Sequence, residues 1–323
     1  MKEFPRIVFF GTPDFAVASL ERVVNSGFPV VAVVTAPDKP AGRGLKENAS
    51  PVKVYAALHG IPVLQPVKMK DPAFLEQLAS YRPDLQIVIA FRMMPRQVWS
   101  LPALGTFNLH ASLLPQYRGA APINRAVMNG ETETGVTTFF LNEQIDTGKI
   151  IMAVKTTIVA DETAGELHDR LMLLGADLVV RTVEMILSGK AGGTLQESMI
   201  VDPEALKQAP KIFRDDCRIN WDQDVSTICN FIRGLSPHPG AFTEMAMSGG
   251  EKQILKLFRA VPEKSMQNVM PGRIYSDGKS YLKIGAKNGF IQILELQLAG
   301  RKVMNSGDFL RGFGKLFPET HGI

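Results

Sequence analysis

Residues 7–16 read Ile7-Val8-Phe9-Phe10-Gly11-Thr12-Pro13-Asp14-Phe15-Ala16. A short, continuous apolar run such as the first four residues is typical of a strand buried on both faces, as in a parallel sheet. A turn with glycine and proline follows, and the sequence from Pro13 to Ser26 then favours a helix. The turn lacks the GxGxxG spacing of a dinucleotide-binding loop, so it does not indicate such a site.

This alternation of strand and helix continues through the first two thirds of the chain. Further apolar runs predict strands at Val30–Val34, Leu85–Ala90, Thr106–His110 and Val136–Leu141. Amphipathic stretches, several of which begin with proline or a small polar residue, predict further helices at Pro51–Leu58, Ala73–Ser80, Pro122–Met128 and Ala164–Leu187. The pattern predicts an α/β fold with a doubly wound, mainly parallel, Rossmann-like sheet.

The pattern changes near residues 202–211, where Ala209-Pro210 and a polar cluster interrupt the helical rhythm. After a predicted helix at Val225–Gly234, short alternating runs with turn residues between them predict antiparallel strands at Ala241–Met245, Gln253–Ala260, Gly272–Tyr275, Tyr281–Gly285 and Phe290–Leu298. We therefore predict two domains, an α/β domain over residues 1–205 and a smaller, OB-like antiparallel β-barrel over residues 206–323.

Composition and charge narrow the class of protein. The 323 residues are 45% hydrophobic and 21% charged, which is ordinary for a folded protein. Residues 211–323 hold 16 Lys and Arg against 11 Asp and Glu, whereas the rest of the chain is balanced. This excess suits contact with a nucleic acid but equally a solvated basic surface. No membrane segment or disulfide framework is indicated, so we expect a cytoplasmic protein.

The stretch with the most chemical information is Asn108-Leu109-His110-Ala111-Ser112-Leu113-Leu114-Pro115-Gln116-Tyr117-Arg118-Gly119. Asn108 and His110 are two positions apart on a predicted strand, so their side chains share one face. They lie near its carboxyl end, where open parallel sheets bind ligands. An amide can stabilise a developing oxyanion, and an imidazole can move protons, a combination that suits acyl transfer. His110 alone would be equally consistent with a structural role.

A carboxylate near the histidine would complete such a site. Asp146 is the leading candidate, because it follows the predicted strand Val136–Leu141 in a glycine-containing loop, although a turn-forming role would also explain it. Ser112 does not lie in a GxSxG elbow, so we expect it to cap a turn and do not expect a serine nucleophile. The pattern requires no metal. The basic segment Pro37–Lys46 is long and rich in Pro and Gly, which is typical of a functional loop or of a surface connection.

Several motifs together resemble those of the folate-dependent formyltransferases over nearly the whole chain, most closely the branch that acts on tRNA. They are Gly11–Ala16, Pro37–Gly44, Ser50–Lys53, Asn108–Gly119, Ala120–Ile123, Glu133–Thr137, Asp146–Gly148 and Ala209–Ile212. By this resemblance Asn108, His110 and Asp146 form the catalytic trio. The implied reaction moves a formyl group from 10-formyltetrahydrofolate to the α-amino group of methionine esterified to initiator tRNA, in a monomer without a metal.

The resemblance also implies binding residues. Folate contacts are expected from Val88, Ala90, Phe91, Ser112, Leu113, Leu114 and Pro115, and tRNA contacts from Lys39, Arg43, Lys46, Arg118 and Lys211. The chain departs from the family pattern in the segment after the strand expected to contact folate. The family has Tyr-Gly and then Ile-Leu-Pro there, whereas this chain has Phe91-Arg92-Met93-Met94-Pro95. Arg92 in place of glycine adds bulk and charge.

Two alternatives remain. The first is a formyltransferase that acts on a small amine, such as glycinamide ribonucleotide or an amino sugar nucleotide. The second is a non-catalytic tRNA-binding protein, against which the intact trio argues.

Overall fold

The computed structural model describes residues 4–41, 46–246, 252–266 and 269–313. The chain divides into two compact units. The first comprises residues 1–120, 133–157 and 168–209, and the second comprises residues 121–132, 158–167 and 210–323. The chain leaves the first unit for the last time between Ala209 and Pro210. This point is close to the expected domain boundary at residues 205/206.

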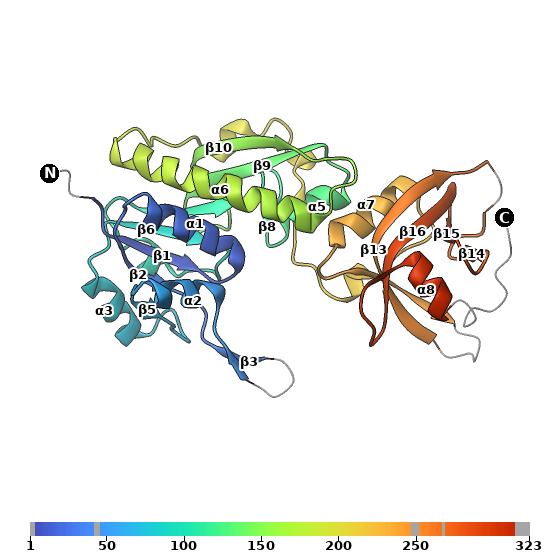
Figure 1. Cartoon of the computed structure of the whole chain (residues 1–323). Helices are drawn as coiled ribbons and strands as arrows, with labels where there is room; N and C mark the ends of the chain where they lie inside the picture. Colours follow the sequence, from blue (N-terminus) through green and yellow to red (C-terminus); the bar gives the residue numbers. More distant parts are fainter. Residues whose placement is uncertain (1–3, 42–45, 247–251, 267–268, 314–323) are drawn as a thin grey trace. The chain divides into compact units, whose positions relative to one another are not determined.

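The first unit is built on a seven-stranded sheet with the order β10-β9-β7-β6-β1-β2-β5 (Figure 1). Its strands are β1 (Ile7–Gly11), β2 (Val30–Val34), β5 (Val63–Leu64), β6 (Leu85–Ile89), β7 (Thr106–His110), β9 (Glu133–Phe140) and β10 (Ile150–Thr157). The five strands from β7 to β5 are parallel, which confirms the predicted mainly parallel α/β sheet. The prediction of a parallel strand at Val136–Leu141 is wrong, because β9 runs antiparallel to β7.

Helices cover both faces of this sheet. The helices that contribute to the first unit are α1 (Asp14–Asn25), α2 (Pro51–Leu58), α3 (Pro72–Ser80), α4 (Arg96–Trp99) and α6 (Ala164–Leu187). On one face, Leu109 of β7 is opposite Gly175 of α6. On the other face, Val8 and Phe10 of β1 share a buried cluster with Phe74 of α3. Glycine at 175 lets the helix approach closely, since an added Cβ would lie 2.6 Å from the Leu109 side chain.

The reversal of β9 has a topological reason. A parallel neighbour needs a crossover that returns across a face of the sheet, usually through a helix. The helix between β7 and β9 is α5 (Pro122–Met128), and it belongs to the second unit instead of covering the sheet. The chain therefore re-enters the sheet from its carboxyl edge, and β9 continues into the antiparallel edge strand β10. β10 begins with the apolar run Ile150–Val154, which the sequence analysis did not identify as a strand.

The second unit is an antiparallel β structure with helices. Its elements, besides α5, are α7 (Val225–Leu235), β12 (Ala241–Ala246), β13 (Lys252–Lys264), β14 (Ile274–Ser276), β15 (Leu282–Ala286), β16 (Gly289–Leu298), β17 (Met304–Asn305) and α8 (Ser306–Phe313). Strands β12, β13, β16, β15 and β14 form the sheet in that order, with β17 on β16. The antiparallel prediction is confirmed. Helix α8 contains two glycines and was not predicted; its buried Phe309 and Leu310 supply the tertiary packing that stabilises it.

The basic segment after β2 contains a hairpin. Strands β3 (Lys39–Ala41) and β4 (Lys46–Asn48) pair in antiparallel register, where the sequence suggested an irregular loop. At its base, Lys53 forms an ion pair with Asp38, and Gln65 Nε2 donates to Asp38 Oδ1 at 2.8 Å. The hydrogen bond from Lys53 holds the pKa of Asp38 below its ordinary value. Figure 1 shows β3 extending away from the sheet of the first unit.

The two cysteines and the lengths of the helices bear on the expectations about disulfides and membrane segments. Cys217 and Cys229 are free thiols, and both are buried. Among the helices that the structure describes, none has the length and apolar character needed to cross a membrane.

Candidate active site

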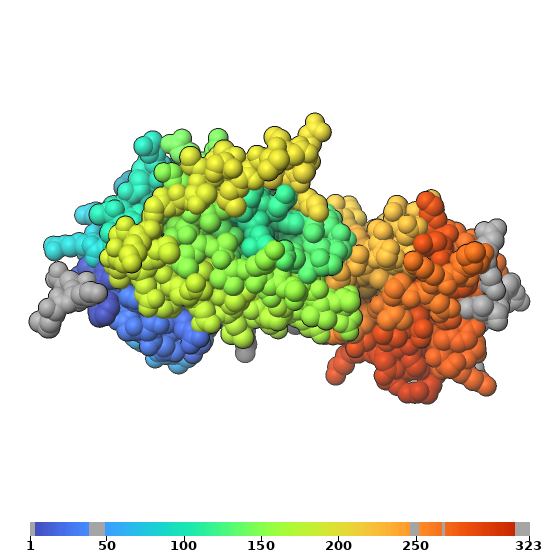
Figure 2. Space-filling model, turned by 90° about the horizontal axis from the view of Figure 1, so that it is seen from above, coloured from blue at the N-terminus to red at the C-terminus, as the bar shows by residue number. Residues whose placement is uncertain are grey.

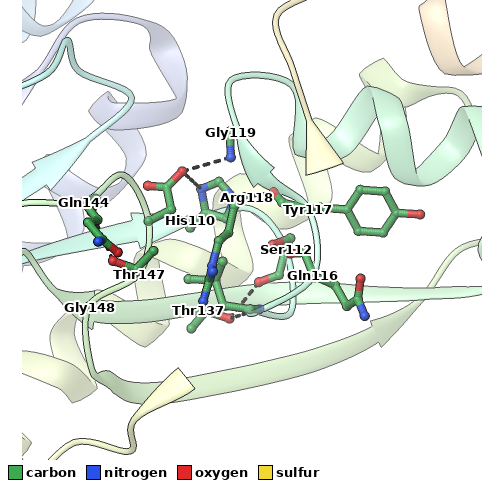
Figure 3. A network of polar contacts seen from close by, with 12 residues as sticks. His110, Ser112, Gln116, Tyr117, Arg118, Gly119, Thr137, Gln144, Thr147 and Gly148 are labelled. Carbon is green, nitrogen blue, oxygen red and sulfur yellow. Dashed lines mark hydrogen bonds and ion pairs between the residues drawn. The ribbon is translucent and has the colours of Figure 1, made fainter. Parts of the chain in front are cut away.

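The three residues expected to be catalytic come from two elements of the first unit. Asn108 and His110 lie on β7, and Asp146 lies in the turn between β9 and β10. The side chain of His110 is buried and that of Asp146 is half-buried, and His110 Nδ1 lies 3.9 Å from Asp146 Oδ2 (Figure 3). This separation is longer than a hydrogen bond but lies within the range of an ion pair.

The other nitrogen of the imidazole ring has a fixed partner. His110 Nε2 lies 2.8 Å from the carbonyl oxygen of Tyr117, and because a carbonyl only accepts, Nε2 carries a hydrogen. Nδ1 is therefore the nitrogen that is available to gain or lose a proton. A proton held there lies on the side of the ring that faces the Asp146 carboxylate. The ring is thus oriented for proton transfer at one defined atom.

The backbone around the site is unusual. Ala90, Tyr117 and Asp146 have positive φ angles of 46°, 61° and 55°. Left-handed backbone is rare in residues other than glycine and costs about 1–3 kcal/mol, and it is concentrated at functional sites. Ala90 follows β6, Tyr117 holds the imidazole, and Asp146 supplies the carboxylate. Two of these positions therefore belong to the predicted site or contact it directly, since Asp146 is a predicted catalytic residue and the Tyr117 carbonyl holds His110.

Asp146 is held on both sides. Its Oδ2 accepts a hydrogen bond from the backbone N–H of Gly119 at 3.0 Å, and its carbonyl oxygen accepts one from Gln196 Nε2 at 2.9 Å. The same Gln196 nitrogen donates to the carbonyl of Gly148 at 2.8 Å, while Gln196 Oε1 accepts from Arg118 at 2.7 and 3.0 Å. Gln196 therefore joins the Asp146 turn to the segment that carries Gly119.

Sequence reasoning missed Gln196. It lies in a 3-10 helix at Gln196–Met199, 50 positions beyond Asp146, in a segment without a recognised motif. Its side chain is fully buried. Thr194, two positions before it, bridges to Ile150 of β10, and Figure 2 shows the yellow segment after α6 on the surface beside green residues of the first unit. A buried glutamine next to two predicted site residues is visible only in three dimensions.

We expect Gln196→Leu to destabilise the protein. Leucine has a similar size but cannot form the four hydrogen bonds, so the buried carbonyls of Asp146 and Gly148 lose a donor. Each buried polar group left without a partner costs about 1–3 kcal/mol. Urea denaturation should show a lower unfolding midpoint than in Gln77→Leu, a control at an exposed glutamine on α3. Equal midpoints would show that Gln196 does not stabilise the turn.

Asn108 has an unused polar atom. Its Oδ1 is buried and has no hydrogen-bond partner among the described residues. Buried polar atoms are normally paired, so such an atom needs an explanation, for example a bound substrate. Asn108 is opposite Val88 in the register between β7 and β6, so the two side chains share a face.

The segment after β7 forms a buried turn. Ser112 Oγ donates to the carbonyl of Gln116 at 2.7 Å, as expected for a residue that closes a turn. Thr137 of β9 donates to the carbonyl of Ser112 at 2.7 Å and accepts from the N–H of Leu114 at 3.2 Å. The side chain of Leu113 lies against Gly135 of β9. These contacts fix the Ser112–Pro115 segment, expected at the folate, beside the histidine.

Ala90 and Phe91 directly follow β6, the strand that pairs with β7. Phe91 packs edge-on against Phe10, with ring centroids 5.6 Å apart. Arg92, the departure from the family pattern, lies with its guanidinium carbon 5.8 Å from the centre of the Phe91 ring and donates to the carbonyls of Pro66 and Val67. The added charge is therefore used to join two loops.

The residues expected to contact tRNA are only partly described. Arg43 lies outside the described residues, as do the side chains of Lys39 and Lys46, whose backbones lie in β3 and β4. Arg118 is half-buried and donates to Gln196. Lys211 lies in the second unit, with its ammonium 5.4 Å from the centre of the Phe213 ring.

The chain matches models of a known protein family. Residues 5–183 match the family model described as formyl transferase, and residues 211–314 match the model of its C-terminal domain. The chain is 53% identical to "Methionyl-tRNA formyltransferase" of Parabacteroides distasonis over 99% of both chains. It is 51% identical to the protein of that name from Bacteroides thetaiotaomicron over 97% of both.

Solved structures share the fold at lower identity. HypX from Aquifex aeolicus, in complex with tetrahydrofolic acid, superposes with a TM-score of 0.62 at 19% identity, covering 99% of this chain and 49% of that one. An N-formyltransferase from Helicobacter canadensis, bound to folinic acid and dTDP-3-aminofucose, gives 0.63 at 20% identity over 90% and 98% of the two chains. These structures share the fold, whereas the family models and the sequence relatives show that the chain belongs to the formyl transferase family, as an enzyme similar over 97–99% of its length to methionyl-tRNA formyltransferases.

Proposed function

We propose that this enzyme transfers the formyl group of 10-formyltetrahydrofolate to the α-amino group of methionine esterified to initiator tRNA, giving formylmethionyl-tRNA for translation initiation. The observation that carries the proposal is the 53% identity to a methionyl-tRNA formyltransferase across both units. The arrangement of Asn108, His110 and Asp146 supports the chemistry. We further propose that it works in the cytoplasm as a monomer.

The three side chains have complementary roles in this reaction. The formyl-folate supplies a carbonyl carbon that is open to attack by an amine. As the amine attacks, the formyl oxygen gains negative charge, which the Asn108 amide would stabilise, together with His110 once its Nδ1 has taken the proton that the amine loses. The amine must lose a proton and the folate N10 must gain one, and Nδ1 of His110 is the available atom for that transfer. The Asp146 carboxylate, 3.9 Å away, faces the resulting positive charge.

The residues present fit a folate at this edge of the sheet. The unpaired Asn108 Oδ1 gives a polar atom for the substrate, next to the buried Val88. The Ser112–Pro115 turn, fixed by the hydrogen bond from Leu114 to Thr137, and the Ala90–Phe91 segment would provide apolar surface for the folate. An apolar pocket with a few polar groups is the usual form of a site for a flat heterocycle.

For the acceptor, we propose that the hairpin with Lys39, Arg43 and Lys46 reaches the tRNA, together with Arg118 and Lys211. The ion pair of Asp38 with Lys53 would anchor the base of this hairpin. Lys and Arg side chains supply most of the sequence-independent affinity for phosphates. Arg43 is the residue that we expect to contribute most, because a guanidinium combines charge with planar hydrogen bonding.

The experiment that tests the acceptor offers formyl-folate with one of three amines in parallel: methionyl initiator tRNA, glycinamide ribonucleotide, or a dTDP-amino sugar. Formylated product is measured by mass spectrometry. We expect product with the charged tRNA at a kcat/KM of roughly 10⁴ M⁻¹s⁻¹ or more, as is typical of enzymes acting on their own substrates. Formylation of a small molecule alone would overturn the tRNA assignment, and tRNA binding without any product would favour a non-catalytic protein.

A further inference from the structure

One short segment, Tyr117–Gly119, contacts both the imidazole and the carboxylate of the candidate site. The carbonyl oxygen of Tyr117 lies 2.8 Å from His110 Nε2, and the backbone N–H of Gly119 donates to Asp146 Oδ2 at 3.0 Å. We call this stretch the holding segment. Because the two contacts are only two residues apart in the chain, a displacement of the holding segment would move both catalytic side chains together.

The holding segment is itself held by a second segment of the first unit, Ala205–Ala209, which we call the strap. The backbone N–H of Tyr117 donates to the carbonyl oxygen of Lys207 at 2.6 Å. Strands β8 (Arg118–Gly119) and β11 (Gln208–Ala209) pair in parallel register. The strap therefore lies beside the holding segment along its whole length.

The side chain of Gln116 fastens the strap. Its Nε2 donates to the carbonyl oxygen of Ala205 at 3.3 Å, and its Oε1 accepts from the backbone N–H of Lys207 at 2.8 Å. At the far end of the strap Ala209 is fully buried, whereas the four residues before it are half-buried or exposed. The Gln116 amide thus supplies an anchor at the end of the strap where side-chain burial supplies little.

The holding segment has an unusual backbone conformation that needs such support. Tyr117 has a φ angle of 61°, and a residue other than glycine keeps a left-handed backbone only where its surroundings enforce it. Gly119 has a φ angle of 123°, and a Cβ added there would lie 2.4 Å from the carbonyl oxygen of Ala209. The strap therefore packs directly on the holding segment, and we expect the segment to relax when the strap is released.

We propose that Gln116 is a positioning residue for formyl transfer. By fastening the strap, it keeps the holding segment in the place where it contacts His110 and Asp146. The Gln116 side chain points away from His110 (Figure 3), so it acts through the holding segment. The inference rests on the proposed catalytic roles of His110 and Asp146. A misplacement of about 1 Å can cost about 100-fold in rate, so a partial release of the strap is measurable as a loss of turnover.

The test compares two substitutions of Gln116 in single-turnover formylation at saturating substrates. Gln116→Met keeps the length of the side chain and removes both hydrogen bonds, so we expect kcat to fall about tenfold. Gln116→Glu keeps an acceptor for the Lys207 N–H and should lose only about threefold or less. In both variants the Kd for tetrahydrofolate should equal that of the wild-type protein.

The matched control is Gln77→Met, at the exposed glutamine of α3. It should retain wild-type kcat, and its unfolding midpoint in urea should be close to that of Gln116→Met. A purely structural role of Gln116 would instead lower the unfolding midpoint and the folate affinity of Gln116→Met together with its kcat. That result, or a wild-type kcat in Gln116→Met, would overturn the inference.

A double variant shows whether Gln116 acts through the imidazole. His110→Ala/Gln116→Met should be no slower than His110→Ala, because groups that act as a unit are not additive. Multiplied losses would contradict the positioning role. The assay uses whichever amine the enzyme formylates, so it does not depend on the acceptor. A slow His110→Ala beside a fast Gln116→Met refutes the positioning role alone, whereas a fast His110→Ala refutes the proposed catalytic role on which it rests.

Discussion

His110→Ala should lower kcat for formyl transfer by about 100- to 10,000-fold, the usual contribution of a positioned general acid or base. The substitution removes the only nitrogen of the described trio that can move a proton, namely Nδ1. It should leave the Kd for charged tRNA unchanged, because His110 is not among the residues proposed to contact tRNA. The measurement is single-turnover formylation at saturating folate, combined with tRNA binding by filter retention.

The chain offers a matched control for this substitution. His168 and Asp169 of α6 form another histidine–carboxylate pair at 3.0 Å, in which Asp169 is exposed and His168 is half-buried. His168→Ala removes a histidine that packs on Phe15, so it can cost some stability, but it should leave kcat unchanged. If His110→Ala lost tRNA binding and turnover in the same proportion, His110 would be structural.

Asp146→Asn should lower kcat by about 100-fold or more. Its unfolding midpoint should stay close to that of the wild-type protein. The amide oxygen of asparagine can still accept the hydrogen bond from Gly119, so the turn keeps that contact. The negative charge opposite His110 Nδ1 is lost. Asp169→Asn makes the same change in the other pair and should retain wild-type turnover.

A double-mutant cycle separates the role of Asp146 from that of His110. If the carboxylate acts through the imidazole, His110→Ala/Asp146→Asn should be no slower than His110→Ala, because groups that act as a unit are not additive. Multiplied losses would show instead that Asp146 contacts the reacting atoms independently. An Asp146→Asn enzyme with wild-type kcat would remove the carboxylate from the mechanism.

The local elements were largely predictable from sequence. Strand Thr106–His110 and helix Ala164–Leu187 have the same bounds in the structure as in the sequence analysis. Apolar runs and amphipathic periods report which face of a segment is buried, and proline marks where a helix begins. The shared face of Asn108 and His110 also follows from the period of a strand alone.

The tertiary contacts between those elements could not be predicted from the sequence. The approach of Asp146 to within 3.9 Å of His110 depends on β9 entering the sheet antiparallel to β7, which the apolar pattern misrepresented as parallel. A buried run has the same appearance in either direction, so its orientation depends on where the intervening chain packs. Here α5 belongs to the second unit, and this fixes the direction of β9.

The sequence by itself determined the α/β and antiparallel classes, most strands and helices, and the face shared by the amide and the imidazole, because these depend on neighbours a few residues away. Only the tertiary structure decided the antiparallel β9, the β3–β4 hairpin, the buried Gln196 under the Asp146 turn, and the use of Arg92 as a link between loops. Those contacts join residues far apart in the chain, and a local pattern shows that a side chain is buried without showing what it contacts.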